Sequence, residues 1–255
     1  MFNKHLNGTN IQTFIFADYA TDLVNNTAIL IFTRTAHEEA QYKQFCENEK
    51  SHANTIIASA LIKHAVGICR QTGIPYFTVF SNQQYGNTFG ERLSNAIAGI
   101  FDSGFENIIA IGNDCLTLSA SQLIAAGNHL QQNGVVLGPT RDGGVYLIGI
   151  NKQIFDAEAI ACLQWQSGKT RDSIIGYLET ANISYAILPM QADVDKPIDL
   201  FEFIAHTNLH SAFIISIRNI LYKAEFIFLQ CKAFIYKSSF FKKNSFRSPP
   251  FFPFS

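Results

Sequence analysis

Ile108-Ile109-Ala110-Ile111-Gly112-Asn113-Asp114-Cys115 is the stretch of sequence that decides the fold. Its first residues form a short continuous apolar run, which is typical of a parallel strand covered on both faces. The run stops at Gly112, so the carboxylate of Asp114 follows a buried strand without a linker. Ligands bind at the carboxyl edge of such sheets, which makes Asp114 a candidate ligand for Mg²⁺ or Mn²⁺. Alternatively, Asn113 and Asp114 form a turn and cap the next helix.

Strand and helix patterns alternate on both sides of this stretch. Apolar runs predict strands at residues 28–32, 76–80 and 185–188. Helical patterns cover residues 52–70, 91–103, 119–132 and 170–180. Alternation of this kind implies βαβ units with right-handed crossovers. We therefore expect an α/β fold that is Rossmann-like, with a mostly parallel sheet.

The pattern changes after Gly134, where two apolar runs, 135–138 and 145–148, are separated by a short turn with Asp142-Gly143-Gly144. This predicts an antiparallel insertion in the sheet. The two glycines let backbone approach a ligand closely. Asp142 is a candidate to hold a sugar hydroxyl or to assist an acceptor, although Asp-Gly between apolar runs is also the commonest hairpin signal.

A third polar segment, Asp193-Val194-Asp195, comes just before a helix that we expect to begin at Pro197. Alternation along an extended segment places both carboxylates on one side. Either one is a candidate to complete a metal site with Asp114. Asp199 is expected in the first turn of the helix, where its charge favours the helix dipole.

Composition narrows the classes of function. The 255 residues are 47% hydrophobic and 15% charged, which excludes a disordered chain. A net charge of -1 without a basic stripe makes nucleic acid an unlikely partner. The five cysteines are scattered without a C-x-x-C pair, which indicates reduced thiols in a cytoplasmic protein. We see no signal peptide and no uninterrupted apolar run long enough for a transmembrane segment.

Three regions follow from these patterns. Residues 1–26 are an N-terminal extension, 27–205 the main domain, and 206–255 a C-terminal helical and Phe-rich extension with a poorly ordered end. Within the last region, residues 212–236 are expected to form a helix that packs on the domain. The alternative is a basic amphipathic segment that makes peripheral contact with a membrane.

The polar segments together resemble a known family, the GT-A-like proteins of the DUF2064 group, often labelled glycosyltransferases. Gly112–Leu116 is similar to its Gly-[Thr/Ser]-Asp-Cys-Pro motif, and Gly138–Gly149 to its more specific Gly-Pro-x-x-Asp-Gly-Gly-Tyr-Tyr-Leu-x-Gly block. Further similarities are Gly90-Glu91-Arg92, the lone Trp165 and the segment Asp193–Leu200. The resemblance covers about residues 27–205.

The resemblance implies a GT-A three-layer sandwich that moves a sugar from a nucleotide-diphosphate sugar to an acceptor not identified by the sequence. It implies a divalent ion, Mg²⁺ or Mn²⁺, between the diphosphate and Asp114, Asp193 and Asp195. Asp142 is the catalytic candidate. The nucleotide and phosphate candidates are Arg34, Arg92, Gly112, Asn113, Gly143 and Gly144.

The chain departs from the family in its first loop, residues 33–40, which contains no glycine and only Arg34 as a cation, with Lys43 close behind. One alternative is a nucleotidyltransferase acting on a phosphorylated small molecule, which usually carries a Gly-rich loop here. Another is a non-catalytic module that binds a nucleotide or sugar phosphate. For Arg92 the alternative is a solvated helix residue, next to a capping box of Thr88 with Glu91.

Overall fold

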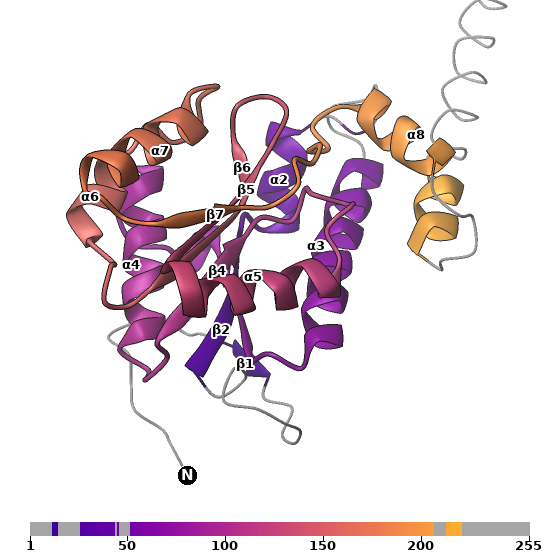
Figure 1. Ribbon diagram of the computed structural model, residues 1–255. Helices are drawn as coiled ribbons and strands as arrows, with labels where there is room; N and C mark the ends of the chain where they lie inside the picture. The colour runs from indigo at the N-terminus through magenta and orange to yellow at the C-terminus, as the bar shows by residue number, and fades with distance from the viewer. Residues whose placement is uncertain (1–11, 15–25, 44, 46–51, 207–212, 221–255) are drawn as a thin grey trace, which may run out of the picture. The chain divides into compact units, whose positions relative to one another are not determined.

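The computed structural model describes residues 12–14, 26–43, 45, 52–206 and 213–220 (Figure 1). The strands are β1 (Gln12–Phe14), β2 (Thr27–Thr33), β3 (Tyr76–Phe80), β4 (Asn107–Ile111), β5 (Val135–Pro139), β6 (Val145–Asn151) and β7 (Tyr185–Ile187). The helices are α2 (Ala36–Tyr42), α3 (His52–Thr72), α4 (Phe89–Phe101), α5 (Ala120–Asn133), α6 (Ala157–Cys162), α7 (Thr170–Thr180) and α8 (Pro197–His206). A short 3₁₀ helix, η1, covers Ser81–Gln83.

These strands form one seven-stranded sheet in the order β1-β3-β2-β4-β6-β5-β7. Strand β2 lies parallel to β3 and β4, and β5 lies parallel to β7. Strand β6 runs antiparallel to both of its neighbours, β4 and β5. The predicted mostly parallel sheet with an antiparallel insertion is confirmed. Strands β4 and β5 therefore run in the same direction, with β6 antiparallel between them. The turn that follows β5 thus lies at the carboxyl edge of the sheet, where β4 also ends.

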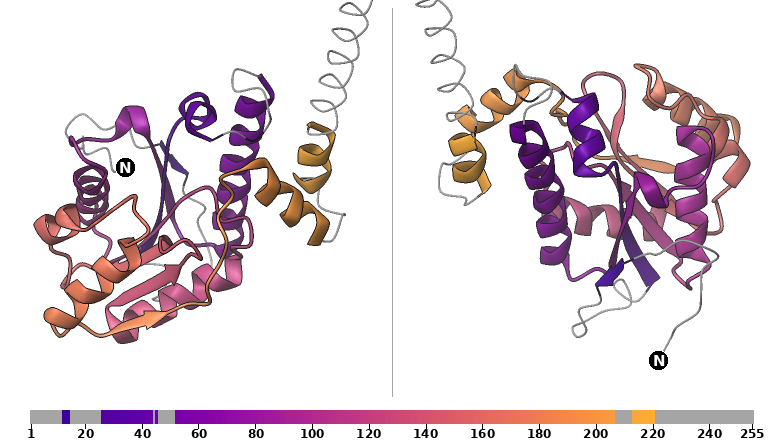
Figure 2. Two further views of the ribbon diagram at one scale, coloured as in Figure 1. Left: turned by 90° about the horizontal axis from the view of Figure 1, so that it is seen from above. Right: turned by 180° about the vertical axis from the view of Figure 1, so that it is seen from behind.

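Two layers of helices cover the sheet, as the view from above in Figure 2 shows. Along β2, Ile29 and Ile31 pack with residues of α3 and α5, including Ile68 and Leu123. Leu30, on the same strand, faces the opposite cluster with α4, α6 and α7. Successive side chains of a strand point to opposite faces, so one apolar run serves both cores. The result is the predicted three-layer α/β sandwich.

Local signals explain where most helices begin. Helix α4 starts at Phe89, two residues before the predicted position, because Thr88 accepts from the backbone N–H of Glu91 in a capping box. Helix α5 begins after Ser119 in the same way. Our prediction of a loop for residues 33–40 was wrong in part, because Thr35 and Glu38 form a further capping box that starts α2.

The chain divides into two compact units, residues 1–207 and 208–255. Strand β1 belongs to the predicted N-terminal extension and pairs antiparallel with β3. In the second unit residues 213–220 are helical, and the remainder of the segment 212–236 lies outside the described residues. Among the described helices, none combines the length and apolarity needed to cross a membrane.

Candidate functional site

A cavity of about 960 Å³ opens at the carboxyl edge of the sheet. Its walls come from the ends of β2 and β4, the β5–β6 turn, the start of α4 and the segment that follows α6. The cavity is lined by the predicted site residues Arg34, Arg92, Gly112, Asn113, Asp114, Asp142, Gly144, Asp193 and Asp195. Gly143 is not among its lining residues. The fold therefore brings together nearly all the residues that the sequence singled out.

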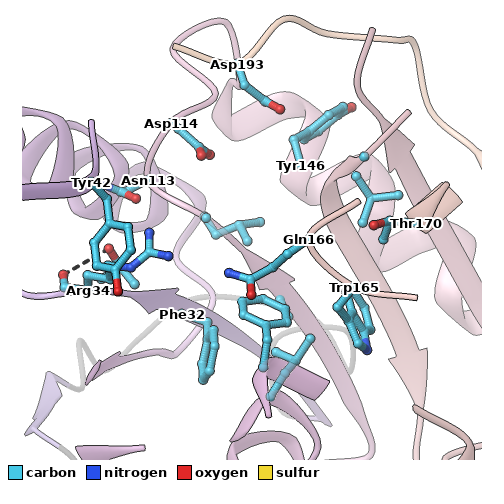
Figure 3. A pocket seen from close by; sticks show the side chains of 18 of the residues that line it. Phe32, Arg34, Tyr42, Asn113, Asp114, Tyr146, Trp165, Gln166, Thr170 and Asp193 are labelled. Carbon is cyan, nitrogen blue, oxygen red and sulfur yellow. Dashed lines mark hydrogen bonds between the residues drawn. The ribbon is translucent and has the colours of Figure 1, made fainter. Parts of the chain in front are cut away.

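The end of β4 presents Asn113 and Asp114 to the cavity (Figure 3). A Cβ atom at Gly112 would lie 2.8 Å from Asp114 Oδ1, so the glycine leaves room for that carboxylate. Asn113 is only 7% exposed, and its Nδ2 has no hydrogen-bond partner among the described residues. A buried donor without a partner is costly and rare in native proteins. Asn113 therefore has a free donor at the cavity wall.

Lys43 lies at the centre of a group of carboxylates. Its Nζ is 2.7 Å from Asp114 Oδ2, 2.8 Å from Asp195 Oδ1 and 3.6 Å from Glu39 Oε1. Burial works against the charged ammonium, but the carboxylates of Asp114, Glu39 and Asp195 outweigh it and hold the pKa of Lys43 above its ordinary value. Lys43 is thus a fixed positive charge that joins α2 to two distant segments of the chain.

Asp193 has a different environment from Asp195. Figure 3 shows its side chain near that of Asp114 at the top of the cavity, with both side chains directed into it. Its Oδ1 is buried without a hydrogen-bond partner among the described residues. Burial, followed by the charges of Asp114 and Asp142, raises the pKa of Asp193 to about 8. This carboxylate needs a proton or a cation to be stable where it lies.

The acidic segment is joined directly to the end of β4. The backbone N–H of Val194 donates to the carbonyl of Asp114 at 3.0 Å. The segment follows β7 as a loop rather than leaving the strand directly, and Asp193 and Asp195 both line the cavity. Asp199 Oδ2 accepts from the backbone N–H of Asp195 and of Lys196, which confirms its structural place in the first turn of α8.

The β5–β6 turn holds Asp142 firmly. Its Oδ1 accepts from the Thr140 hydroxyl and from the backbone N–H of Gly144. The Thr140 hydrogen bond is the main reason why the pKa of Asp142 is lowered. Gly143 has φ +90°, and a Cβ there would lie 2.0 Å from the carbonyl oxygen of Gly168. Gly143 is required by the turn itself, and Asp142 remains an ionised hydrogen-bond acceptor.

Helix α2 engages the cations that were expected to face phosphate. Arg34 Nη1 lies 3.2 Å from Glu39 Oε2, and the guanidinium stacks on the Tyr42 ring with 4.1 Å between Cζ and the ring centroid. Glu39 is only 2% exposed and contacts Arg34 and Lys43 at once. Both cations line the cavity, but an internal carboxylate already partners them.

Arg92 lies at the start of α4 on the cavity wall, where its Nη1 donates to the carbonyl of Asn87 at 3.3 Å. The neighbouring capping box of Thr88 with Glu91 is confirmed. The guanidinium has five N–H donors, so this one bond leaves capacity for a ligand. Arg92 therefore has both a local structural contact and access to the cavity.

An aromatic group lines the same cavity and was not recognised as part of a site from the sequence. Phe32 and Phe89 meet edge to face with 5.5 Å between ring centroids, and Phe89 lies 5.5 Å from Trp165. Gln166 follows with φ +55°, a backbone conformation that is uncommon outside glycine. Trp165 attracted notice only through the family resemblance, because nothing local shows that β2, α4 and the α6–α7 connection converge.

A divalent ion can be tested against this donor set. Among the described residues, no group of three or more His, Cys, Asp or Glu side chains is placed to hold a metal ion by itself. Two carboxylates with substrate phosphates are enough for Mg²⁺ or Mn²⁺. Asp193 Oδ1, which has no hydrogen-bond partner among the described residues and lies near Asp114, is the kind of donor that such an ion requires. The residues present fit an ion that is shared with a phosphorylated ligand.

Comparison with known proteins supports the family resemblance. Residues 58–166 match the family described as "Uncharacterized protein conserved in bacteria (DUF2064)". This segment contains Arg92, Asp114, Asp142 and Trp165 but neither Lys43 nor the acidic segment at 193–195. No curated protein has a detectably similar sequence.

One solved structure shares this fold over most of the chain. A protein from Desulfovibrio desulfuricans G20, provisionally assigned as a nucleotide-diphospho-sugar transferase, superposes with a TM-score of 0.68 at 17% identity over 78% of this chain and 98% of its own. Rv0371C of Mycobacterium tuberculosis H37Rv in complex with manganese is more distant, with a TM-score of 0.40 at 11% identity over 71% of this chain and 100% of its own. A CMP:2-keto-3-deoxy-manno-octonic acid synthetase with CTP has a TM-score of 0.41 at 10% identity over 70% and 96%. The first likeness establishes the fold, and the other two are too distant to bear on function.

Proposed function

We propose that the protein, whose residues 58–166 match the DUF2064 family, is a cytoplasmic, divalent-metal-dependent transferase acting on nucleotide-diphosphate sugars. The observation that carries the proposal is the pair Asp114 and Asp193 at the edge of the cavity, where a buried oxygen of Asp193 has no partner among the described residues. Carboxylates in this position suit a ligand whose negative charge is brought in together with a cation.

Asp114 and Asp193 would hold Mg²⁺ or Mn²⁺ against the diphosphate. When bound, the ion supplies Lewis-acid neutralisation of the charge that develops on the leaving diphosphate. Arg34 and Arg92 are the guanidinium groups available on the cavity wall to add positive charge there. To do so, Arg34 must break its ion pair with Glu39 and bind the phosphate instead. Asn113 Nδ2, which lacks a partner among the described residues, is a donor for a phosphate or ribose oxygen.

Asp142 fits a positioning role toward the reacting hydroxyl group. The Thr140 hydrogen bond lowers its pKa, so it stays ionised at neutral pH and accepts a hydrogen bond from a sugar or acceptor hydroxyl. A strong general base needs a pKa close to the working pH. Asp142 therefore orients a hydroxyl better than it removes its proton.

One observation favours a different function, a non-catalytic nucleotide or sugar-phosphate binding module. Glu39 engages both Arg34 and Lys43, the cations nearest to the expected phosphate position. A module that binds weakly and does no chemistry tolerates such pairing. The nucleotidyltransferase alternative gains no comparable support, because residues 33–40 form the start of a capped helix instead of a Gly-rich phosphate loop.

Thermal unfolding with a panel of nucleotide-diphosphate sugars and NTPs, with and without Mn²⁺, tests the proposal. A transferase of the proposed kind is stabilised by one of the sugars only when Mn²⁺ is present, and it releases the nucleoside diphosphate when acceptors are added. Stabilisation by an NTP but by no nucleotide sugar indicates the nucleotidyltransferase. Stabilisation without turnover indicates the binding module, and the absence of any nucleotide effect contradicts all three.

Asp114→Asn provides the residue-level test. The variant should keep the fold, because asparagine preserves an acceptor for Lys43, and should lose the Mn²⁺-dependent part of the stabilisation. Asp102→Asn is the matched control, because Asp102 is exposed at the end of α4 and does not line the cavity. Unfolding of Asp114→Asn with an unchanged control would make Asp114 a structural residue.

A further inference from the structure

The cavity has a second end that differs in character from the carboxylate end. We call it the aromatic end and define it by Phe32, Phe89, Trp165 and Gln166. In Figure 3 the labelled Phe32 and Trp165 lie at the bottom of the view, whereas Asp114 and Asp193 lie at the top. A single ligand that fills the cavity must therefore combine a charged, metal-binding group with a part suited to aromatic contact.

The aromatic end is rigid before any ligand arrives. The indole Nε1 of Trp165 donates to the carbonyl of Ile160 at 2.7 Å, so its one polar atom is already bonded to backbone. Gly90 allows α4 to approach this segment, because a Cβ there would lie 2.3 Å from the carbonyl oxygen of Ala161 and 2.8 Å from Trp165 Cδ1. With the N–H committed, Trp165 offers only ring carbons to a ligand, packed against Phe89 at 5.5 Å. Preorganised contacts of this kind lose little entropy on binding.

Gln166 is the polar group that stands over this aromatic floor. Its φ of +55° is strained for a residue with a long side chain, and strain of this kind persists mainly at ligand-binding and active sites. In Figure 3 its amide extends into the cavity between Phe32 and Trp165. No hydrogen bond of this amide to any other described residue exists, so its two donors and its acceptor are available. The strained backbone thus delivers an unused amide to the cavity.

We propose that the aromatic end binds the sugar of the nucleotide-diphosphate sugar and that the Gln166 amide determines specificity through the sugar hydroxyls; this inference rests on the proposed function. A pyranose ring has an apolar face of C–H groups and a rim of hydroxyls. The aromatic floor suits the C–H face, and Gln166, with Arg92 and Ser167 also on the cavity wall, suits the rim. A nucleobase also stacks on aromatic rings and forms hydrogen bonds at its edge, and the titration below separates the two occupants.

Calorimetric titration in Mn²⁺ with matched pairs tests the assignment: UDP with UDP-glucose, GDP with GDP-mannose, and ADP and CDP with their glucose forms. For at least one pair the wild-type protein should bind the sugar form at least about tenfold more tightly than the diphosphate. Gln166→Gly should abolish that difference and leave the affinity for the diphosphate within about twofold. Because glycine adopts a positive φ without strain, this variant should melt no lower than the wild type.

Gln164→Ala is the matched control, because Gln164 lies two residues earlier, is exposed and does not line the cavity, and it should bind both members of each pair like the wild type. Trp165→Leu should also lose the difference in affinity between the sugar form and the diphosphate. Gln166→Asn retains an amide and tolerates the left-handed region, so it should keep part of the difference that Gln166→Gly loses. Equal weakening of diphosphate and sugar form in Gln166→Gly would place the base at the aromatic end and overturn the inference. Binding of a diphosphate with Mn²⁺ but no difference in affinity in any pair would overturn it as well, leaving the proposed function in place. If no nucleotide binds at all, the proposed function fails first.

Discussion

Lys43 shows how one side chain determines the charge balance of the cavity. Its ammonium contacts Asp114 and Asp195 at 2.7 and 2.8 Å, on oxygens that a divalent ion would also seek. An ion and Lys43 therefore compete for the same carboxylates. A diphosphate relieves that competition, because its oxygens offer the lysine another partner. We accordingly expect metal and nucleotide to bind cooperatively.

Lys43→Met separates these effects. Removing the ammonium leaves its carboxylate partners uncompensated, so without metal the variant should be less stable by roughly 2–4 kcal/mol. Mn²⁺ alone should restore part of that stability, whereas Mn²⁺ alone should leave the wild type unchanged. Chemical denaturation with and without Mn²⁺ measures both effects, and Lys63→Met, at an exposed position of α3, is the control. Equal Mn²⁺ effects on wild type and variant would show that Lys43 does not compete with the ion.

Without metal, Asp193→Asn should stabilise the folded protein, whereas Lys43→Met should destabilise it. The pKa of Asp193 in the folded protein is about 8, against an ordinary value of 3.8, so between these values the folded state keeps a proton that the unfolded chain has lost. Stability conferred by this proton is complete below pH 3.8 and declines as the pH rises toward 8. Asparagine has no proton to lose, so without metal the free energy of unfolding of the variant should rise relative to that of the wild type from pH 4 to pH 8.

Denaturation curves at pH 4, 6 and 8 in a chelator are the measurement for Asp193→Asn. Asp102→Asn, which changes an exposed carboxylate elsewhere, should follow the wild type at each pH. A variant less stable than the wild type at pH 8 would mean that Asp193 forms a stabilising contact that outweighs its repulsion by Asp114 and Asp142.

At the scale of elements, the β5–β6 turn and the start of α7 form one unit. Gly143 packs against the Gly168 carbonyl, and the backbone N–H of Arg171 donates to the Gly143 carbonyl at 2.9 Å. Gly143→Ala combines a disfavoured positive φ with a clash against backbone, so we expect a loss of about 2–4 kcal/mol. The matched variant Gly176→Ala lies within α7 with open space around it and should be neutral or stabilising. The melting temperatures of the two variants show whether a loss of stability comes from the β5–β6 turn or from any added methyl group.

Helices and strands were predictable where apolar residues recur with a regular period along the sequence. The strand at Ile108–Ile111 and the helices α3, α5 and α7 were found within a few residues, because apolar periodicity and caps agree there. Helix α2 was missed although its Thr35-Ala36-His37-Glu38 capping signal was present, since its seven residues show little periodicity. The carboxylates of the site were found from strand ends. The aromatic end was not, because its members come from separate elements that only the tertiary fold brings together.

For the molecule as a whole, two buried thiols report on opening of the core. Burial raises the pKa of both Cys69 and Cys115 to about 12, and they are 0% and 7% exposed. At pH 8 they should react with iodoacetamide only through unfolding, at least about 100-fold more slowly than the exposed Cys162. Mn²⁺ with a bound nucleotide sugar should slow Cys69 and Cys115 together, because the ligand stabilises the folded state as a whole.

Peptide mapping by mass spectrometry gives the three rates separately. Rapid labelling of Cys115 with slow labelling of Cys69 would contradict the prediction, since it would show that the segment after β4 opens locally without the core. Ligand protection of Cys115 alone would lead to the same conclusion.

The hydrogen bond from Val194 to Asp114 also has a consequence for synthesis of the protein. The strand that carries Asp114 leaves the ribosome long before the acidic segment that completes its surroundings. Until residue 195 has emerged, the nascent chain lacks Asp195, which pairs with Lys43, and Asp193, which lies near Asp114. Parallel pairings of distant segments form late in folding. We therefore expect the growing polypeptide to lack the proposed nucleotide and metal site until nearly all of the sheet-bearing unit has been made.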